Sequence, residues 1–210
     1  MAMMIAGGYL LYEKVAHTAS LVFETEGDAI PALVRRTYGP HDVLIPGEWL
    51  TRKTEQRSDP NMISVRLPYR TVLAETETPS LEADHPWNDS RIGILIHRPS
   101  TTVPQAELLS SVYIPNTIPR SIDVAGLEAR AFNDHSGYDG ETLYIGRDAG
   151  RTFIARCADT GRKSLRYACL HIVQVSNDLE FAVQFPTSLL GDWRRFDVAV
   201  DRLIRGMLAS

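Results

Sequence analysis

The clearest pattern in the chain is an alternation of apolar and polar residues in its second half. In residues 179–185, Leu179, Phe181, Val183 and Phe185 share one face of an extended segment. Because the stretches between such segments are short and rich in turn residues, neighbouring strands should run antiparallel. The pattern therefore predicts a meander of about five strands: Leu127–Phe132, Glu141–Ile145, Thr152–Cys157, Tyr167–Val175 and Leu179–Phe185. A tight hairpin at Ser176–Asp178 should join the last two.

A helical period replaces the alternation near the C-terminus. Apolar residues recur there at steps of three or four: Leu189, Trp193, Phe196, Val200, Leu203 or Ile204, and Met207. A helix with one apolar face has to cover another layer, and the meander supplies it. The sequence thus predicts an α+β, two-layer domain in which an antiparallel meander sheet is covered by a C-terminal helix. Trp193 and Phe196 should then be buried against Phe181, Val183 or Phe185.

The first half of the chain has a less regular pattern. Arg91–His97 is the most hydrophobic short run and is predicted as a central strand. Residues 75–90 hold five carboxylates, two prolines and no Lys or Arg, which is typical of a long exposed loop. Other predicted elements are three short strands and one short helix: Leu21–Glu24, Val43–Ile45, Met62–Leu67 and Pro104–Tyr113. Because Pro68 cannot donate to a sheet ladder, the third of these strands should lie at an edge or end there.

Residues 2–12, AMMIAGGYLLY, form an uncharged run of eleven residues. As a helix this run would span about 16 Å, roughly half of a bilayer core. Three interpretations are open: the second half of a signal anchor that begins upstream of Met1, an N-terminal helix packed on the domain, or a degenerate signal peptide. The chain accordingly divides into residues 1–19, a membrane-anchor remnant or N-terminal helix, and residues 20–210, a single α+β domain.

Composition narrows the class of protein. The chain has 210 residues, of which 44% are hydrophobic and 23% charged, as in ordinary soluble domains. These values exclude a disordered chain, a collagen, a coiled coil and a polytopic membrane protein. The net charge is −4 and neither half of the chain is basic, so we expect no nucleic-acid partner.

The two cysteines, Cys157 and Cys169, fall in two neighbouring predicted strands. Asp159-Thr160-Gly161 is a turn signal between them, so the strands can pair antiparallel with both sulfurs on one face. A non-hydrogen-bonded pair of positions brings the Cβ atoms close enough for a disulfide. Such a bond persists only in an oxidising compartment, which favours the periplasm. The opposing interpretation is two free buried cysteines in a cytoplasmic protein.

Several short segments carry a family resemblance. They are Gly137-Tyr138-x-Gly140-Glu141, Phe153–Cys157, Cys169 and Leu190–Arg194. With them the chain resembles a group of uncharacterised proteobacterial proteins that have one N-terminal membrane anchor and a periplasmic domain. The resemblance covers residues 125–208 well and residues 40–100 loosely. It implies a location and a fold, and it brings no catalytic residues. The helix-on-meander plan is also similar to PsbP/Mog1-like domains, which are mostly binding or assembly factors; this is fold analogy alone.

Candidate chemistry is sparse. Asp134, His135 and Asp139 lie in one polar loop, and together with His85 they are weak candidates for metal ligands. His171 alternates with Cys169 and is expected to be a half-buried, hydrogen-bonded core residue. We expect no catalytic residues and no cofactor.

Two hypotheses about function follow. The first is a non-catalytic periplasmic domain, tethered to the inner membrane, that binds an envelope protein or a small ligand. The alternative is a hydrolase or metal-dependent enzyme whose site is assembled from loops, for example from Asp134, His135, Asp139 and His85.

Overall fold

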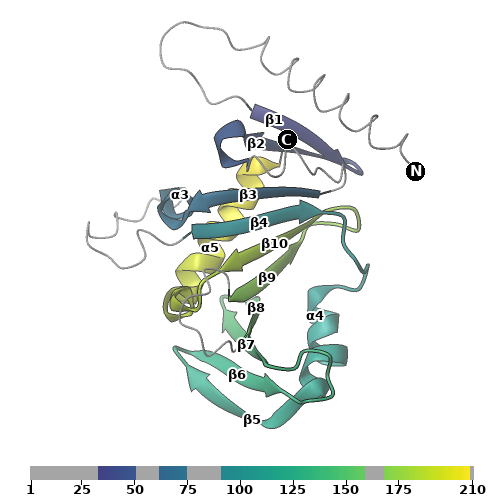
Figure 1. Ribbon diagram of the computed structural model, residues 1–210, viewed down its shortest axis with the longest axis vertical. Coiled ribbons are helices and arrows are strands. Elements are labelled where there is room, and N and C mark those ends of the chain that lie inside the picture. Colours follow the sequence, from purple (N-terminus) through teal and green to yellow (C-terminus); the bar gives the residue numbers. More distant parts are fainter. Residues whose placement is uncertain (1–32, 51–61, 75–90, 159–167, 209–210) are drawn as a thin grey trace, which may run out of the picture.

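A large antiparallel sheet dominates the computed structural model, which describes residues 33–50, 62–74, 91–158 and 168–208 (Figure 1). Its eight strands follow the spatial order β3-β4-β10-β9-β8-β7-β6-β5. The strands are β3 (Met62–Pro68), β4 (Arg91–His97), β5 (Thr117–Val124), β6 (Leu127–Phe132), β7 (Glu141–Asp148), β8 (Arg151–Ala158), β9 (Cys169–Gln174) and β10 (Glu180–Phe185). From β5 to β10 each strand pairs with the next in the chain, which confirms the predicted meander. The sheet is larger than the five strands expected because β3, β4 and β5 extend it at its two ends.

The C-terminal helix α5 (Trp193–Met207) crosses one face of this sheet, behind the strands in Figure 1. It follows a short 3₁₀ segment, Thr187–Asp192, and contacts β7 as well as β2. Phe196 packs on Phe185 with ring centroids 4.5 Å apart, as predicted. Trp193 is buried, also as predicted, but it stacks on Phe153 of β8 at 5.5 Å. The predicted two-layer α+β arrangement is confirmed.

Two smaller elements complete the core beneath α5. The short helix α3 (Tyr69–Ala74) brings the Tyr69 ring to 6.0 Å from that of Phe196. A separate hairpin of β1 (Leu33–Tyr38) and β2 (His41–Pro46), followed by a 3₁₀ turn at Gly47–Trp49, sits at the C-terminal end of α5. The Tyr38 hydroxyl donates to the Ile96 carbonyl at 3.2 Å and fixes this hairpin to β4.

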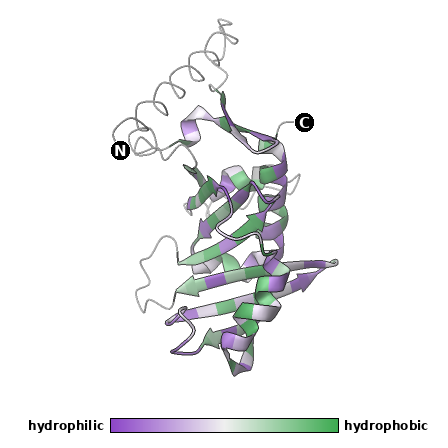
Figure 2. Ribbon diagram, turned by 90° about the vertical axis from the view of Figure 1, so that its right-hand side faces the viewer, coloured by the Kyte–Doolittle hydropathy of each residue, from purple (hydrophilic) through white to green (hydrophobic). Residues whose placement is uncertain are grey.

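A second, smaller apolar cluster lies on the opposite face of the sheet. It is formed by α4 (Gln105–Leu108), a π-helical turn (Leu109–Tyr113) and a 3₁₀ turn (Ile114–Asn116) packed on β6, β7 and β8. The segment carries the chain from β4 to the far edge of the sheet at β5. The predicted helix over Pro104–Tyr113 therefore exists, although it changes its winding after Leu108. Figure 2 shows the apolar residues of the strands and helices.

Most predicted elements are present. The edge position of Met62–Leu67 is confirmed because β3 ends the strand order. The hairpin at Ser176–Asp178 is confirmed by the hydrogen bond from the Val175 N–H to the Leu179 carbonyl. The predicted strand Leu21–Glu24, the predicted loop 75–90 and residues 1–19 lie outside the described residues. Within the part of the chain that is described, no helix is long and apolar enough to cross a membrane.

Candidate functional site

The sheet splits between β8 and β9. These strands pair over three residue pairs, from Cys157↔Cys169 to Ala155↔His171, whereas β7 and β8 pair over eight. Within the described residues, Arg151–Ile154 have no partner on β9. A pocket of about 410 Å³ lies at this split. Its walls come from β8, β9, α5 and the segment that precedes α4, so it reaches both faces of the sheet.

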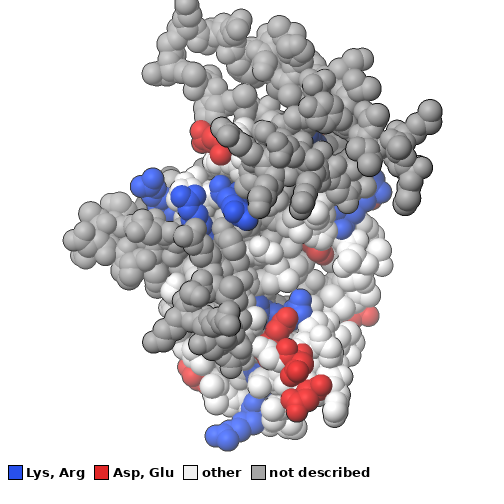
Figure 3. All heavy atoms as spheres, viewed as in Figure 1, with Lys and Arg blue, Asp and Glu red and all other residues white. Residues whose placement is uncertain are grey.

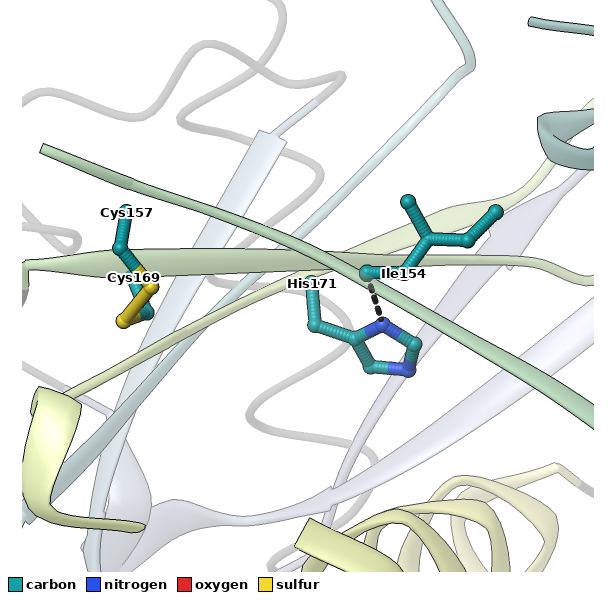
Figure 4. Close-up of a disulfide and its surroundings, with 4 residues drawn as sticks. All are labelled: Ile154, Cys157, Cys169 and His171. Atoms are coloured by element: carbon teal, nitrogen blue, oxygen red, sulfur yellow. Dashed lines mark hydrogen bonds between the residues drawn. A yellow bond between two sulfur atoms is a disulfide. The ribbon is translucent and has the colours of Figure 1, made fainter. Parts of the chain in front are cut away.

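His171 stands at the point where the strands separate. Its Nδ1 lies 2.7 Å from the Ile154 carbonyl oxygen (Figure 4). Because a carbonyl only accepts, Nδ1 carries the proton, and in the neutral ring Nε2 is left as an acceptor. The side chain is 7% exposed, and its burial lowers the pKa of His171. The prediction of a hydrogen-bonded histidine within the sheet is confirmed, and the residue is more deeply buried than expected.

Asp197 of α5 faces this histidine. Its Oδ1 lies 3.6 Å from His171 Nε2, and its Oδ2 accepts from Arg151 Nη2 at 2.8 Å. Arg151 also reaches Asp201, one helical turn further along, with Nη1 3.8 Å from Oδ2. Burial raises the pKa of Asp197, an effect that the neighbouring His171 and Arg151 partly oppose. The imidazole of His171 and the carboxylate of Asp197 are thus buried side by side, with an acceptor atom of each facing the other. Arg151, which also lines the pocket, binds the carboxylate.

One feature of the sequence, the position of Asp197 in the C-terminal helix, could have pointed to this cluster. Asp197 lies next to Phe196, within the apolar stripe of the helix. A carboxylate at a position that faces the sheet needs a partner there, because an unpaired buried charge is strongly unfavourable. The partners, Arg151 and His171, come from two different strands. Their approach could not be read from the sequence.

A second titratable pair, His97 and Glu180, joins β4 and β10. The two residues are direct cross-strand partners, with His97 Nε2 3.5 Å from Glu180 Oε1. The Glu180 side chain is 7% exposed, and burial raises the pKa of this carboxyl. The imidazole Nδ1 of His97 is 2.6 Å from the Arg98 carbonyl, so Nδ1 donates and Nε2 faces the carboxylate.

The disulfide occupies the other end of the β8–β9 pairing. Cys157 and Cys169 are bonded, with their Cα atoms 4.0 Å apart (Figure 4). The neighbouring N–H of Ala158 donates to the Ala168 carbonyl at 2.8 Å, so the cysteines occupy the adjacent non-hydrogen-bonded pair. The predicted bond and its position in the ladder are both confirmed.

The predicted metal candidates are only partly within the described structure. Asp134, His135 and Asp139 lie in the loop between β6 and β7, where the His135 N–H donates to Asn133 Oδ1 at 3.1 Å in a local turn. Among the residues that the structure describes, no group of three or more His, Cys, Asp or Glu side chains could hold a metal ion. His85 lies outside the described residues, so the four-residue site stays a prediction.

The surface carries charges of both signs. On the face opposite α5, acidic and basic side chains form small groups separated by uncharged surface (Figure 3). Some of them are paired across strands, as in the contact of 3.1 Å between Arg156 Nη1 and Glu141 Oε2. The Arg156 guanidinium also lies over the Tyr138 ring at 4.6 Å, which ties the β6–β7 loop to β8.

Comparison with known protein families and with curated proteins finds no match. Among solved structures, the fold is similar to that of Smlt3025, an immunity protein of the Stenotrophomonas maltophilia type IV secretion system. The TM-score is 0.55 at 17% identity, over 90% of this chain and 100% of that chain. The two chains share a fold. A second structure, the iron-regulated outer membrane lipoprotein FrpD of Neisseria meningitidis, gives a TM-score of 0.40 at 12% identity, over 83% of this chain and 92% of that one. Both of these proteins are proteobacterial.

Proposed function

We propose that the protein is a non-catalytic domain of the bacterial envelope that binds another envelope protein, and that residues 1–19 tether it to the inner membrane. The observation that carries the proposal is the fold similarity to a secretion-system immunity protein along the whole length of that chain. The Cys157–Cys169 disulfide supports a location outside the cytoplasm, because thiols are kept reduced in the cytoplasm.

The location is tested by fractionating cells that express the full chain or a variant that lacks residues 1–19. We expect the full chain in the membrane fraction, with its disulfide intact, and the shortened chain in the soluble periplasmic fraction when it is exported by a foreign signal peptide. The melting temperature of the two forms should be nearly equal, since a tether contributes nothing to the folded core. A full chain found in the cytoplasm, with both thiols free, would contradict the proposal.

The binding role is tested by chemical cross-linking in intact cells, followed by purification of the full chain from membranes. We expect one envelope protein in stoichiometric amount, which should bind again when both proteins are purified separately and mixed. A matched control uses the Trp193→Ala variant, whose α5 packing is damaged, at a temperature where it is partly unfolded. Recovery of the full chain alone, with no partner that rebinds, would refute the role.

A further inference from the structure

Two hydrogen-bond acceptors face each other at the pocket between β8 and β9. His171 Nδ1 donates to the Ile154 carbonyl, so Nε2 of the neutral ring has only a lone pair to offer. Asp197 Oδ1 lies 3.6 Å from that nitrogen. Within the described part of the chain, the side chain that donates to this carboxylate is Arg151, and it binds the other oxygen, Oδ2. When the pair holds no shared proton, one donor that serves both acceptors at this separation would satisfy them.

The charged and aliphatic residues that line the pocket indicate which kind of hydrogen-bond donor it would bind. Asp197 and Asp201 place two carboxylates in its lining; Arg151 binds Asp197 Oδ2, and Arg205 binds Asp201 at 3.0 Å. The Oδ1 atom of Asp197 faces His171 and not a guanidinium, so this carboxylate oxygen favours a cation over a neutral donor. The remaining wall is partly aliphatic, with Pro104, Ile172 and Val173 among its residues. Such walls suit an alkyl chain better than a fully hydrated ion.

We propose that this pocket binds a primary ammonium group at the end of an unbranched alkyl chain. The ammonium has three N–H donors on one atom, so it can donate to His171 Nε2 and to Asp197 Oδ1 together. Its alkyl chain then lies along the aliphatic wall. The same chemistry is offered by a lysine side chain of a protein and by a free alkylamine. The inference goes beyond the proposed function, because envelope location and partner binding do not depend on it.

A proton competes for the same position. The charged groups around the pair are Arg151 on β8, Asp148 on β7, and Asp201 with its partner Arg205 on α5. When the pH falls, the His171–Asp197 pair takes up one proton between Nε2 and Oδ1, and this proton satisfies both acceptors. Burial lowers the pKa of His171, which favours the neutral ring with Nε2 as an acceptor, and raises the pKa of Asp197. Ammonium binding should therefore weaken on acidification.

The first experiment titrates the full chain with n-butylammonium chloride and follows the NMR signals of the His171 ring and the Asp197 amide. We expect saturable shifts with a dissociation constant on the order of 1 mM, as is reasonable for so small a ligand. Two matched probes should give no saturable shift: 1-butanol, which lacks the charge, and tetramethylammonium, which lacks N–H donors. A blocked lysine, N-acetyl-lysine methylamide, distinguishes the sources, because a lysine-binding pocket accepts it and a pocket for free amines excludes it. Absence of saturable binding by both ammonium probes overturns the proposal.

The second experiment uses Asp197→Asn, which keeps the shape of the side chain and removes its charge. We expect the affinity for n-butylammonium to fall at least about tenfold, as for the loss of one charged hydrogen bond. The control Asp134→Asn makes the same change in an exposed loop and should leave the affinity unchanged. If Asp197→Asn does not fold, the wild-type protein still decides the matter, because its affinity should fall as the pH is lowered and the His171–Asp197 pair takes up its proton. Unchanged affinity in a folded Asp197→Asn protein, or affinity independent of pH, would overturn the proposal.

Discussion

Gly146 of β7 shows how tightly single residues are fitted beneath α5. A Cβ atom at this position would lie 2.6 Å from the Trp193 ring and 2.9 Å from Leu127. Gly146→Ala therefore has to displace the indole, and we expect the free energy of unfolding to fall by about 1–3 kcal/mol. Urea unfolding monitored by tryptophan fluorescence measures the change.

Gly206 gives the matched control. It lies near the end of α5, is exposed, and a Cβ there would meet no atom within 4 Å. Gly206→Ala should raise the free energy of unfolding by about 0.5–1 kcal/mol through helix propensity alone. A destabilisation of the same size at both glycines would show that contact with Trp193 is not the cause at Gly146.

Glu180 makes stability depend on pH. Burial raises the pKa of this carboxyl, so the folded protein binds the proton more tightly than the unfolded chain does. Ionised Glu180 is therefore unfavourable at neutral pH, and this penalty disappears as the pH falls through the raised pKa. Glu180→Gln should be more stable than the wild type near pH 7, and the difference in stability should shrink on acidification.

The comparison of melting temperatures across pH checks this expectation for Glu180. Glu107→Gln, an exposed change on α4, should alter stability by less than about 0.5 kcal/mol. A Glu180→Gln protein that is less stable than the wild type at neutral pH would mean that the contact with His97 favours the carboxylate by more than burial disfavours it.

At the scale of elements, the packing of α5 on the sheet depends strongly on Trp193. The side chain is 2% exposed, stacks on Phe153, and donates from its indole N–H to the Ala125 carbonyl at 3.3 Å. Trp193→Ala should lower the free energy of unfolding by about 3–5 kcal/mol. The neighbouring Arg194→Ala, at a half-exposed position, should change it by less than about 1 kcal/mol. A loss below about 1 kcal/mol for Trp193→Ala would refute the described packing.

The sequence was informative for elements whose pattern is local. The period-2 segment Leu179–Phe185 and the helical stripe after Leu189 each bury one face, so their patterns follow directly from the packing. The strand β5 was missed because six of its eight residues are exposed, because it contains Pro119, and because its pairing with β6 shifts between Thr117 and Ser121. An exposed, irregular edge strand leaves little periodicity to detect.

The pocket was also not predictable from the sequence, and the reason differs from that for β5. It exists because β8 and β9 separate beyond Ala155 and His171, and no local pattern in either strand reports where pairing stops. Cys157 and Cys169 were predictable because the sequence carries a turn signal, Asp159-Thr160-Gly161, between their two predicted strands. Arg151 and Asp197 were not, since they lie 46 residues apart in the chain and meet only in the folded protein.

At the scale of the whole molecule, the sheet consists of two four-stranded halves joined at the β8–β9 pairing, one of β5 to β8 and one of β9, β10, β4 and β3. Three residue pairs and the disulfide hold this junction. Replacing Cys157 and Cys169 by serine should therefore lower the free energy of unfolding by about 3 kcal/mol. Thermal unfolding with and without reductant measures the loss.

The presence of the bond in the purified protein has its own test. Alkylation of the denatured chain without reductant should add no alkyl group to the intact mass, and alkylation after reduction should add two, one at each cysteine. Two groups added without reductant to protein taken from the periplasm would show that the bond does not form there, and would remove a main support for the proposed location.

The position of the disulfide also changes what a protease can do to the protein. Arg162, Lys163 and Arg166 lie between the cysteines, so a tryptic cut after any of these three residues falls inside the loop that the disulfide closes. A cut there produces two polypeptides that stay bonded and keep the β8–β9 ladder aligned. On a gel, the nicked protein should migrate as one species until it is reduced. Breaking one peptide bond in this segment would thus leave the two fragments covalently joined until the disulfide is reduced, and after reduction the β4–β10 pairing and the packing of α5 would still hold them together in the folded protein.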